Sequence, residues 1–162
     1  MFYKIIAAIV AFVVWLFPSL QRIQPLDNTA IANSVISAMK TRDVTALEAL
    51  MCKNIKDNTS DLPGEIGKLL DAMDGEKTEF TWLRAGGCTV TDGKGHTINQ
   101  NYLLIDITTS SEKYGFLIIL ETYNNLSPAE MGIRSIALIL KADPVNDLYR
   151  IQATNGLYEW HE

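Results

Sequence analysis

Hydrophobic positions recur at helical spacing in the first part of the chain that follows Pro25. The apolar stripe of the first predicted helix consists of Ile31, Val35, Ile36 and Met39. Asp27 precedes this stripe as a favoured N-cap, and the cationic residues Lys40 and Arg42 suit a helix C-terminus. Asp43 begins a second, shorter helix, and Asp61 begins a third that ends at Asp74-Gly75. The pattern therefore predicts three helices before any strand.

From Thr78 onward the hydrophobic period changes to two, which is the period of a half-buried strand. The first strand begins at Thr78 and is separated by the Gly86-Gly87 pair from a second strand. The second and later predicted strands cover 88–91, 99–109, 113–123, 134–141 and 148–153, with a polar loop at 124–132. Helices followed by an antiparallel sheet predict an α+β fold in which the helices cover one face of the sheet.

The strongest predicted pair is the hairpin formed by 99–109 and 113–123. If Thr109 lies opposite Tyr114, one face of this hairpin is nearly all apolar and must lie under the helices. In the same register Tyr102 faces Glu121 and Asp106 faces Leu117 on the second face, which mixes apolar side chains with two carboxylates. We expect this second face to be covered by a partner subunit, by the chain's own termini or by a ligand.

The carboxylates of Asp106 and Glu121 are candidates for acid–base chemistry. The proposed register separates them by four residues, or roughly 13 Å, which is beyond the separation used by paired glycosidase carboxylates. We therefore reject the pair and expect each carboxylate to be solvated or hydrogen-bonded. Strand aromatics could line an apolar pocket. The predicted ligand-binding set is Trp82, Tyr102, Asp106, Glu121, Tyr123 and Arg134, and no catalytic residue is assigned.

The N-terminus carries a targeting pattern. Residues 5–17 form an unbroken apolar run of thirteen residues after Lys4. A signal-peptide core spans about 7 to 15 residues, whereas a membrane-spanning helix needs about 20. We predict that residues 1–24 are a signal peptide or an N-terminal membrane anchor, with cleavage left open. Residues 25–162 are then a single α+β domain, exported to the cell surface or held on the membrane outside the cytoplasm.

Composition and charge limit the classes of partner that we expect. The chain has 162 residues and is 48% hydrophobic, which suits one domain. Fourteen Lys and Arg against nineteen Asp and Glu give a net charge of -5 without a basic cluster, which argues against a nucleic-acid partner. In an oxidising compartment Cys52 and Cys88 could form a disulfide, and the sequence does not decide whether they meet. His96 and His161 lack ligand spacing, so we predict no metal site and no cofactor.

Two resemblances add to this interpretation. The run from Met39 to Leu50 resembles the opening of the nuclear-transport-factor-two-like superfamily, which has a cone-shaped, cystatin-like α+β fold. Segments 62–75, 101–109 and 127–136 resemble an uncharacterised domain-of-unknown-function family, family 5104, of exported proteins from Gram-positive bacteria (Firmicutes). The resemblance implies a curved antiparallel sheet wrapped around helices, with a pocket at the open end of the cone. It implies no chemistry.

The functional prediction is a non-catalytic binding module, exported or tethered to a membrane through its N-terminal segment only. It would use the second sheet face or the cone pocket for a small apolar ligand or a protein partner. Two alternatives stay open. One is a homodimeric assembly domain, and the other is a small pocket enzyme of isomerase or hydrolase type that uses Asp106 or Glu121 as its base.

Overall fold

The computed structural model describes residues 23–153. The predicted signal peptide or anchor at 1–24 lies almost wholly outside the described residues. Between residues 23 and 153, no helix has the length and apolar character needed to cross a membrane.

The helices begin where the sequence places its aspartates. Their bounds are Asn28–Thr41 for α2, Val44–Leu50 for α3, Lys53–Asn58 for α4 and Leu62–Asp71 for α5. Asp27, Asp43 and Asp61 each accept a hydrogen bond from a backbone N–H in the first turn of α2, α3 and α5, as predicted. The prediction missed α4, because this short helix has no side-chain cap and buries only Ile55. The described residues thus contain four α-helices before the first strand, where three were predicted.

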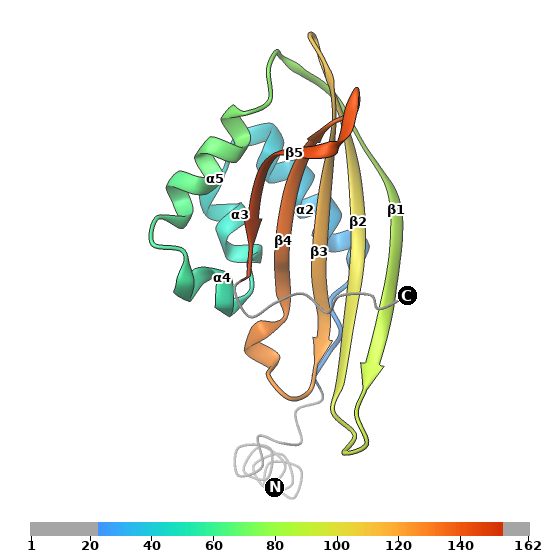
Figure 1. Ribbon diagram of the computed structural model, residues 1–162. Helices are drawn as coiled ribbons and strands as arrows, with labels where there is room; N and C mark the ends of the chain where they lie inside the picture. The colour runs from blue at the N-terminus through green and yellow to red at the C-terminus, as the bar shows by residue number, and fades with distance from the viewer. Residues whose placement is uncertain (1–22, 154–162) are drawn as a thin grey trace, which may run out of the picture.

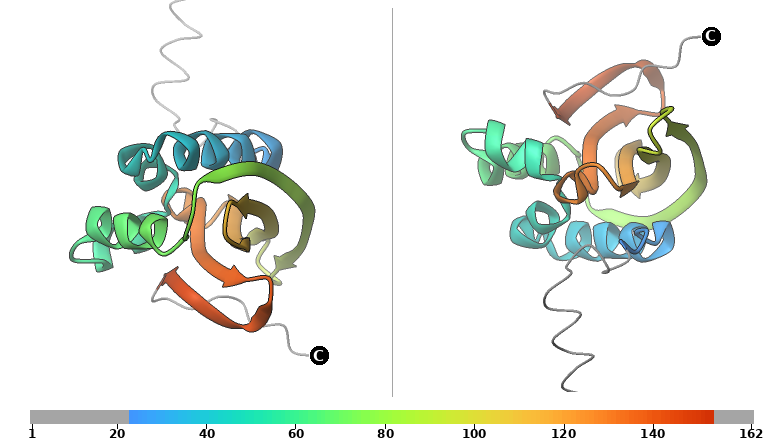
Figure 2. Two further views of the ribbon diagram at one scale, coloured as in Figure 1. Left: turned by 90° about the horizontal axis from the view of Figure 1, so that it is seen from above. Right: turned by 90° about the horizontal axis from the view of Figure 1, so that it is seen from below.

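The strands form one antiparallel sheet in chain order. Their bounds are Lys77–Thr91 for β1, Thr97–Thr109 for β2, Lys113–Asn124 for β3, Gly132–Leu140 for β4 and Asp143–Gln152 for β5. The order in the sheet is β1-β2-β3-β4-β5. The helices gather on one face, and the sheet is strongly curved when viewed along its strands (Figures 1 and 2). The α+β prediction is therefore confirmed, while the likeness to the nuclear-transport-factor-two-like cone stays a prediction.

Two strand boundaries were wrong. Gly86 and Gly87 do not interrupt the sheet but lie within the continuous strand β1. A Cβ atom at Gly87 would lie 1.9 Å from Oδ1 of Asn101, so this glycine permits a close approach from β2. Strand β5 begins at Asp143, not at 148, because Leu140 pairs with Asp143 and Ile139 with Asp147. The predicted turn residues are a bulged part of the paired strand.

The register of the central hairpin differs from the prediction by two residues. Tyr102 faces Ile119, and Asp106 faces Gly115. The turn is tighter than expected, since Thr108 pairs with Lys113 and the N–H of Thr109 donates to the carbonyl of Glu112 at 2.9 Å. A shift of two keeps every side chain on its predicted face and changes only its partner.

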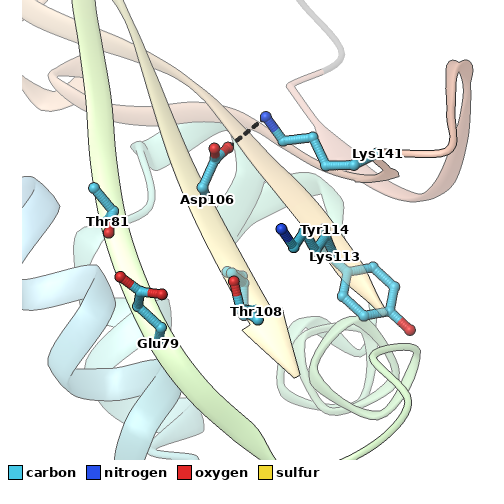
Figure 3. Close-up of a pocket in the computed structure, with 8 residues that line it drawn as sticks. Glu79, Thr81, Asp106, Thr108, Lys113, Tyr114 and Lys141 are labelled. Atoms are coloured by element: carbon cyan, nitrogen blue, oxygen red, sulfur yellow. Dashed lines mark ion pairs between the residues drawn. The ribbon is translucent and has the colours of Figure 1, made fainter. Parts of the chain in front are cut away.

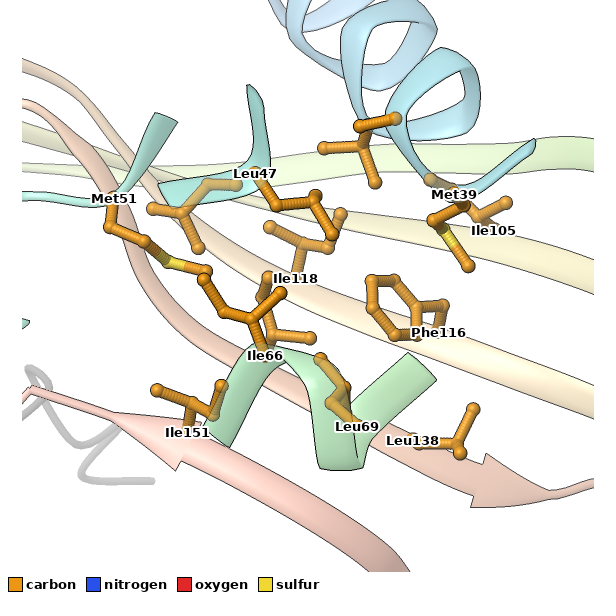
Figure 4. Close-up of a cluster of buried hydrophobic side chains, with 14 of the residues drawn as sticks. Met39, Leu47, Met51, Ile66, Leu69, Ile105, Phe116, Ile118, Leu138 and Ile151 are labelled. Carbon is orange, nitrogen blue, oxygen red and sulfur yellow. The ribbon is translucent and has the colours of Figure 1, made fainter. Parts of the chain in front are cut away.

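The predicted core face of the hairpin is confirmed. Leu103, Ile105, Phe116 and Ile118 are fully buried. They pack against the helices through residues that include Met39, Leu47, Ile66 and Leu69 (Figure 4). We call the opposite side of the sheet, which carries Tyr102, Leu104, Asp106, Leu117 and Ile119, the open face.

A glycine joins the helical layer to the sheet at the start of β4. Met51 forms a parallel bridge with Ile133, and the N–H of Cys52 donates to the carbonyl of Ile133 at 3.0 Å. Gly132 has a φ of +134°, and a Cβ atom there would lie 2.8 Å from the carbonyl oxygen of Leu50. Only glycine fits this close approach without strain.

Candidate functional site

The fold separates the six predicted ligand-binding residues. Trp82 pairs with Ile105 and packs, partly buried, against the helix-covered core rather than on the open face. Tyr102 is half-buried on the open face opposite Ile119. Tyr123 is half-buried near the end of β3. The remaining three residues, Asp106, Glu121 and Arg134, lie in two polar sites far apart on the sheet.

The first site is a buried ion pair. Nη1 of Arg134 donates to Oε2 of Glu121 at 2.9 Å, and Nδ2 of Asn124 donates to Oε1 of the same carboxylate at 2.5 Å. A register shift in the pairing of β3 with β4 leaves Arg134 between the paired residues Ile133 and Ser135. Both oxygens of Glu121 therefore accept hydrogen bonds from internal donors, which suits a structural anchor better than a general base.

A second polar group lies beside this pair. Gln100 faces Glu121 across β2 and β3 and is only 1% exposed. Within residues 23–153, neither Nε2 nor Oε1 of Gln100 has a hydrogen-bond partner. An unsatisfied buried amide costs about 1–3 kcal/mol, so this position suits an interior water or another polar group.

The second site is a pocket of about 400 Å³ at the opposite end of the open face, near the turn between β2 and β3. We call it the Asp106–Lys141 pocket (Figure 3). Its lining consists of Glu79, Thr81, Asp106, Ile107, Thr108, Lys113, Tyr114 and Lys141. Four of these eight residues, Glu79, Asp106, Lys113 and Lys141, carry a charged group.

A glycine on β3 lies beside the ion pair of this pocket. Gly115 lies between Asp106 on β2 and Ile139 on β4. A Cβ atom at Gly115 would lie 2.8 Å from Cγ1 of Ile139, so neighbouring side chains already pack over this position. Nζ of Lys141 reaches Oδ1 of Asp106 at 2.6 Å, and these side chains are 35% and 32% exposed. Lys141 follows β4 and Asp106 lies on β2, so the ion pair spans β3.

Two further charges lie in the neighbouring row of the sheet. Glu79 pairs with Thr108, and Thr108 pairs with Lys113, so a carboxylate and an ammonium group occupy opposite sides of Thr108 (Figure 3). Both charged residues are exposed. Neither forms an ion pair with any residue whose side chain the structure describes. The pocket therefore offers one charge of each sign to a ligand, beside the Asp106–Lys141 pair.

A second hollow adjoins the pocket. It has a volume of about 400 Å³ and shares Thr108, Lys113 and Lys141 with the Asp106–Lys141 pocket. Hydroxyl groups of Thr109 and Ser111 add to its lining. Lys113 and Lys141 thus line both hollows.

Sequence reasoning found Asp106 but missed Glu79, Lys113 and Lys141. The three missed residues come from three different strands or strand ends, and only pairing brings them together. The one local signal was the position of Lys113 directly after the turn, where it must face a residue near the end of β2. A charged residue at a strand end is so common that this signal alone does not indicate a site.

Metal and thiol chemistry find little support in the described part of the chain. No group of three His, Cys, Asp or Glu side chains between residues 23 and 153 could hold a metal ion. Cys52 and Cys88 are both free thiols. Burial raises the pKa of Cys52, which keeps it protonated and unreactive.

The matched family spans most of the helices and the sheet. The model of the family described as Domain of unknown function (DUF5104) matches residues 34–142. The chain belongs to this family. The match runs from within α2 to just beyond β4 and includes Asp106, Lys113 and Lys141, so the pocket lies in the DUF5104 region. A comparison with curated proteins finds no match to this chain.

Proposed function

We propose that this DUF5104 protein is a non-catalytic binding module that holds a small polar ligand in the Asp106–Lys141 pocket. The observation that carries the proposal is the hollow of about 400 Å³, lined by four charged residues, two of which form an ion pair. This volume lies at the small end of the range for small-molecule sites, about 300–1,000 Å³. Because four of the eight lining residues carry charged groups, we propose a ligand with charged groups of its own in place of the apolar ligand that the sequence suggested.

Binding is favoured over catalysis because the two candidate bases are already engaged. Glu121 is held by Arg134 and Asn124, and Asp106 is held by Lys141. Asp106 faces Gly115, six positions before Glu121 on β3, which separates the two carboxylates by roughly 20 Å. Neither carboxylate can therefore assist the other in an acid–base step.

We also propose that the ligand is bound outside the cytoplasm. The support is the apolar run at residues 5–17, which has the length of a signal-peptide core. Protease added to intact cells should digest the domain if it lies outside, and a domain that survives until the cells are lysed would contradict this location.

Native mass spectrometry of the full chain, purified in a mild detergent, tests the binding proposal. We expect a discrete small-molecule adduct on the wild-type protein or after incubation with a diverse set of polar metabolites. The variant Lys141→Met should lose most of the adduct, because it leaves Asp106 unpaired in the pocket and so upsets the charge balance of the lining. The control Lys94→Met changes an exposed lysine in the turn between β1 and β2 and should keep it. Equal adducts on both variants would contradict the pocket.

A further inference from the structure

We infer that the ligand of the Asp106–Lys141 pocket is a zwitterion, a small molecule with a free amine and a free carboxylate, such as an amino acid or a dipeptide. This inference rests on the proposed binding function and adds the chemical class of the ligand. Glu79 would receive the amine, and Lys113 would receive the carboxylate.

The placement of the two charges carries the first step. Glu79 and Lys113 pair with Thr108 from either side, on β1 and β3. Both residues line the same pocket, so the carboxylate and the ammonium group flank one small hollow. A small ligand seated over Thr108 can therefore meet a charge of each sign.

The balance of charge carries the second step. Asp106 and Lys141 neutralise each other at 2.6 Å, which leaves one carboxylate and one ammonium group for the ligand. A ligand with only a negative charge would also meet Glu79, and one with only a positive charge would also meet Lys113. A zwitterion alone pairs with both and repels neither, and such unfavourable contacts with the wrong ligand are a common source of specificity.

Size sets the upper limit. The volume of about 400 Å³ admits a small molecule but not a folded partner or a long peptide. Because Glu79 and Lys113 are exposed, each contact contributes modestly. Removing one charge from either side should weaken binding roughly two- to fivefold, without abolishing it.

The test titrates the full chain in mild detergent with three probes by isothermal calorimetry. The probes are the dipeptide Ala-Ala, its N-acetyl form and its C-terminal amide. We expect Ala-Ala to bind and each blocked form to bind at least twofold more weakly. Glu79→Gln should remove the preference for a free amine, and Lys113→Gln should remove the preference for a free carboxylate. The controls Glu76→Gln and Lys94→Gln change exposed charges outside the pocket and should leave all three affinities unchanged.

The contrary results distinguish failure of the zwitterion inference from failure of the proposed binding function. If the blocked dipeptides bind as tightly as Ala-Ala, the zwitterion is wrong while the pocket still binds a small molecule. If no dipeptide binds and the native adduct is lost in Lys141→Met, the ligand belongs to another class and the inference is overturned. If no dipeptide binds and no adduct of any kind forms, both the inference and the proposed function fall.

Discussion

Nη1 of Arg134 lies 2.9 Å from Oε2 of Glu121, and the two side chains are only 6% and 1% exposed. Opposite charges this deeply buried depend on each other, because removing one leaves the other without compensation in a medium of low dielectric constant. The pair links β3 to β4. We therefore expect the fold to lose less stability when both charges are removed than when only one is.

A double-mutant cycle on this pair checks the dependence. We expect Arg134→Met to lower the free energy of unfolding by about 3–5 kcal/mol, because it strands the Glu121 carboxylate. The double variant with Glu121→Leu should recover most of that loss. Urea unfolding of the four proteins measures the coupling, and strictly additive losses would show that the charges act independently.

Gly115 offers a prediction on packing beside the ion pair of the pocket. The variant Gly115→Ala places a methyl group 2.8 Å from Cγ1 of Ile139, so we expect a loss of about 1–3 kcal/mol in unfolding free energy. Adding Ile139→Val should recover part of the stability. Thermal unfolding measures the stability of both variants. A Gly115→Ala variant as stable as the wild type would contradict the predicted clash with Ile139.

Replacing two other glycines with alanine should have opposite effects on stability. Gly132→Ala should destabilise the fold by about 1–3 kcal/mol, because the position has a positive φ and a Cβ atom would contact the carbonyl of Leu50. Gly67 lies inside α5, and a Cβ atom there meets no atom within 4 Å. Gly67→Ala should therefore stabilise the protein by about 0.5–1 kcal/mol. The midpoints of urea unfolding measure both stability changes. Two substitutions that shift the midpoint in the same direction would contradict this prediction.

A hydrogen bond between β5 and α5 predicts a pH dependence. The hydroxyl of Tyr149 donates to Glu65, which also accepts from Nζ of Lys68 at 2.7 Å. Hydrogen bonds from Lys68 and then from Tyr149 lower the pKa of Glu65. A lowered pKa in the folded state gives stability that is present above the unfolded pKa and is lost as pH falls through the folded one.

The variant Tyr149→Phe removes one of these donors. We expect it to be less stable than the wild type at neutral pH, with the difference shrinking as Glu65 becomes protonated in acid. Unfolding midpoints measured from pH 7 down to pH 3 follow the change. Glu76→Gln, an exposed carboxylate elsewhere, serves as the control. A difference that stays constant across this range would assign the effect to packing of the tyrosine ring.

The two thiols should differ in reactivity. Cys52 is fully buried and has a raised pKa, whereas Cys88 on β1 is half-buried. A thiol reagent at pH 8 should therefore label Cys88 first and reach Cys52 only when the fold opens. Peptide mass mapping of the labelled protein identifies the site. Cys88→Ser should abolish the fast phase, and fast labelling of Cys52 in that variant would contradict its burial.

The parts of this fold that the sequence determines are local. Asp27, Asp43 and Asp61 mark helix starts because a capping side chain acts within three residues of itself. The core and open faces of the central hairpin follow from alternation, which survives a register shift of two. Helix α4 escaped prediction because nothing local distinguishes it from a loop, and contacts such as the bond from Asn54 to Glu130 support it from a distance.

Tertiary structure decided which side chains meet. The turn at Thr109–Glu112 set the register, placing Asp106 opposite Gly115 and Glu121 opposite Gln100. Pairing of β1, β2 and β3 then aligned Glu79 and Lys113 across Thr108, although 34 positions separate them in the chain. No local pattern predicts that these two side chains share a row. A single bulge or one extra turn residue would change the strand register that aligns them. The chain's own sequence thus predicts the layers, and the paired strands assemble the site.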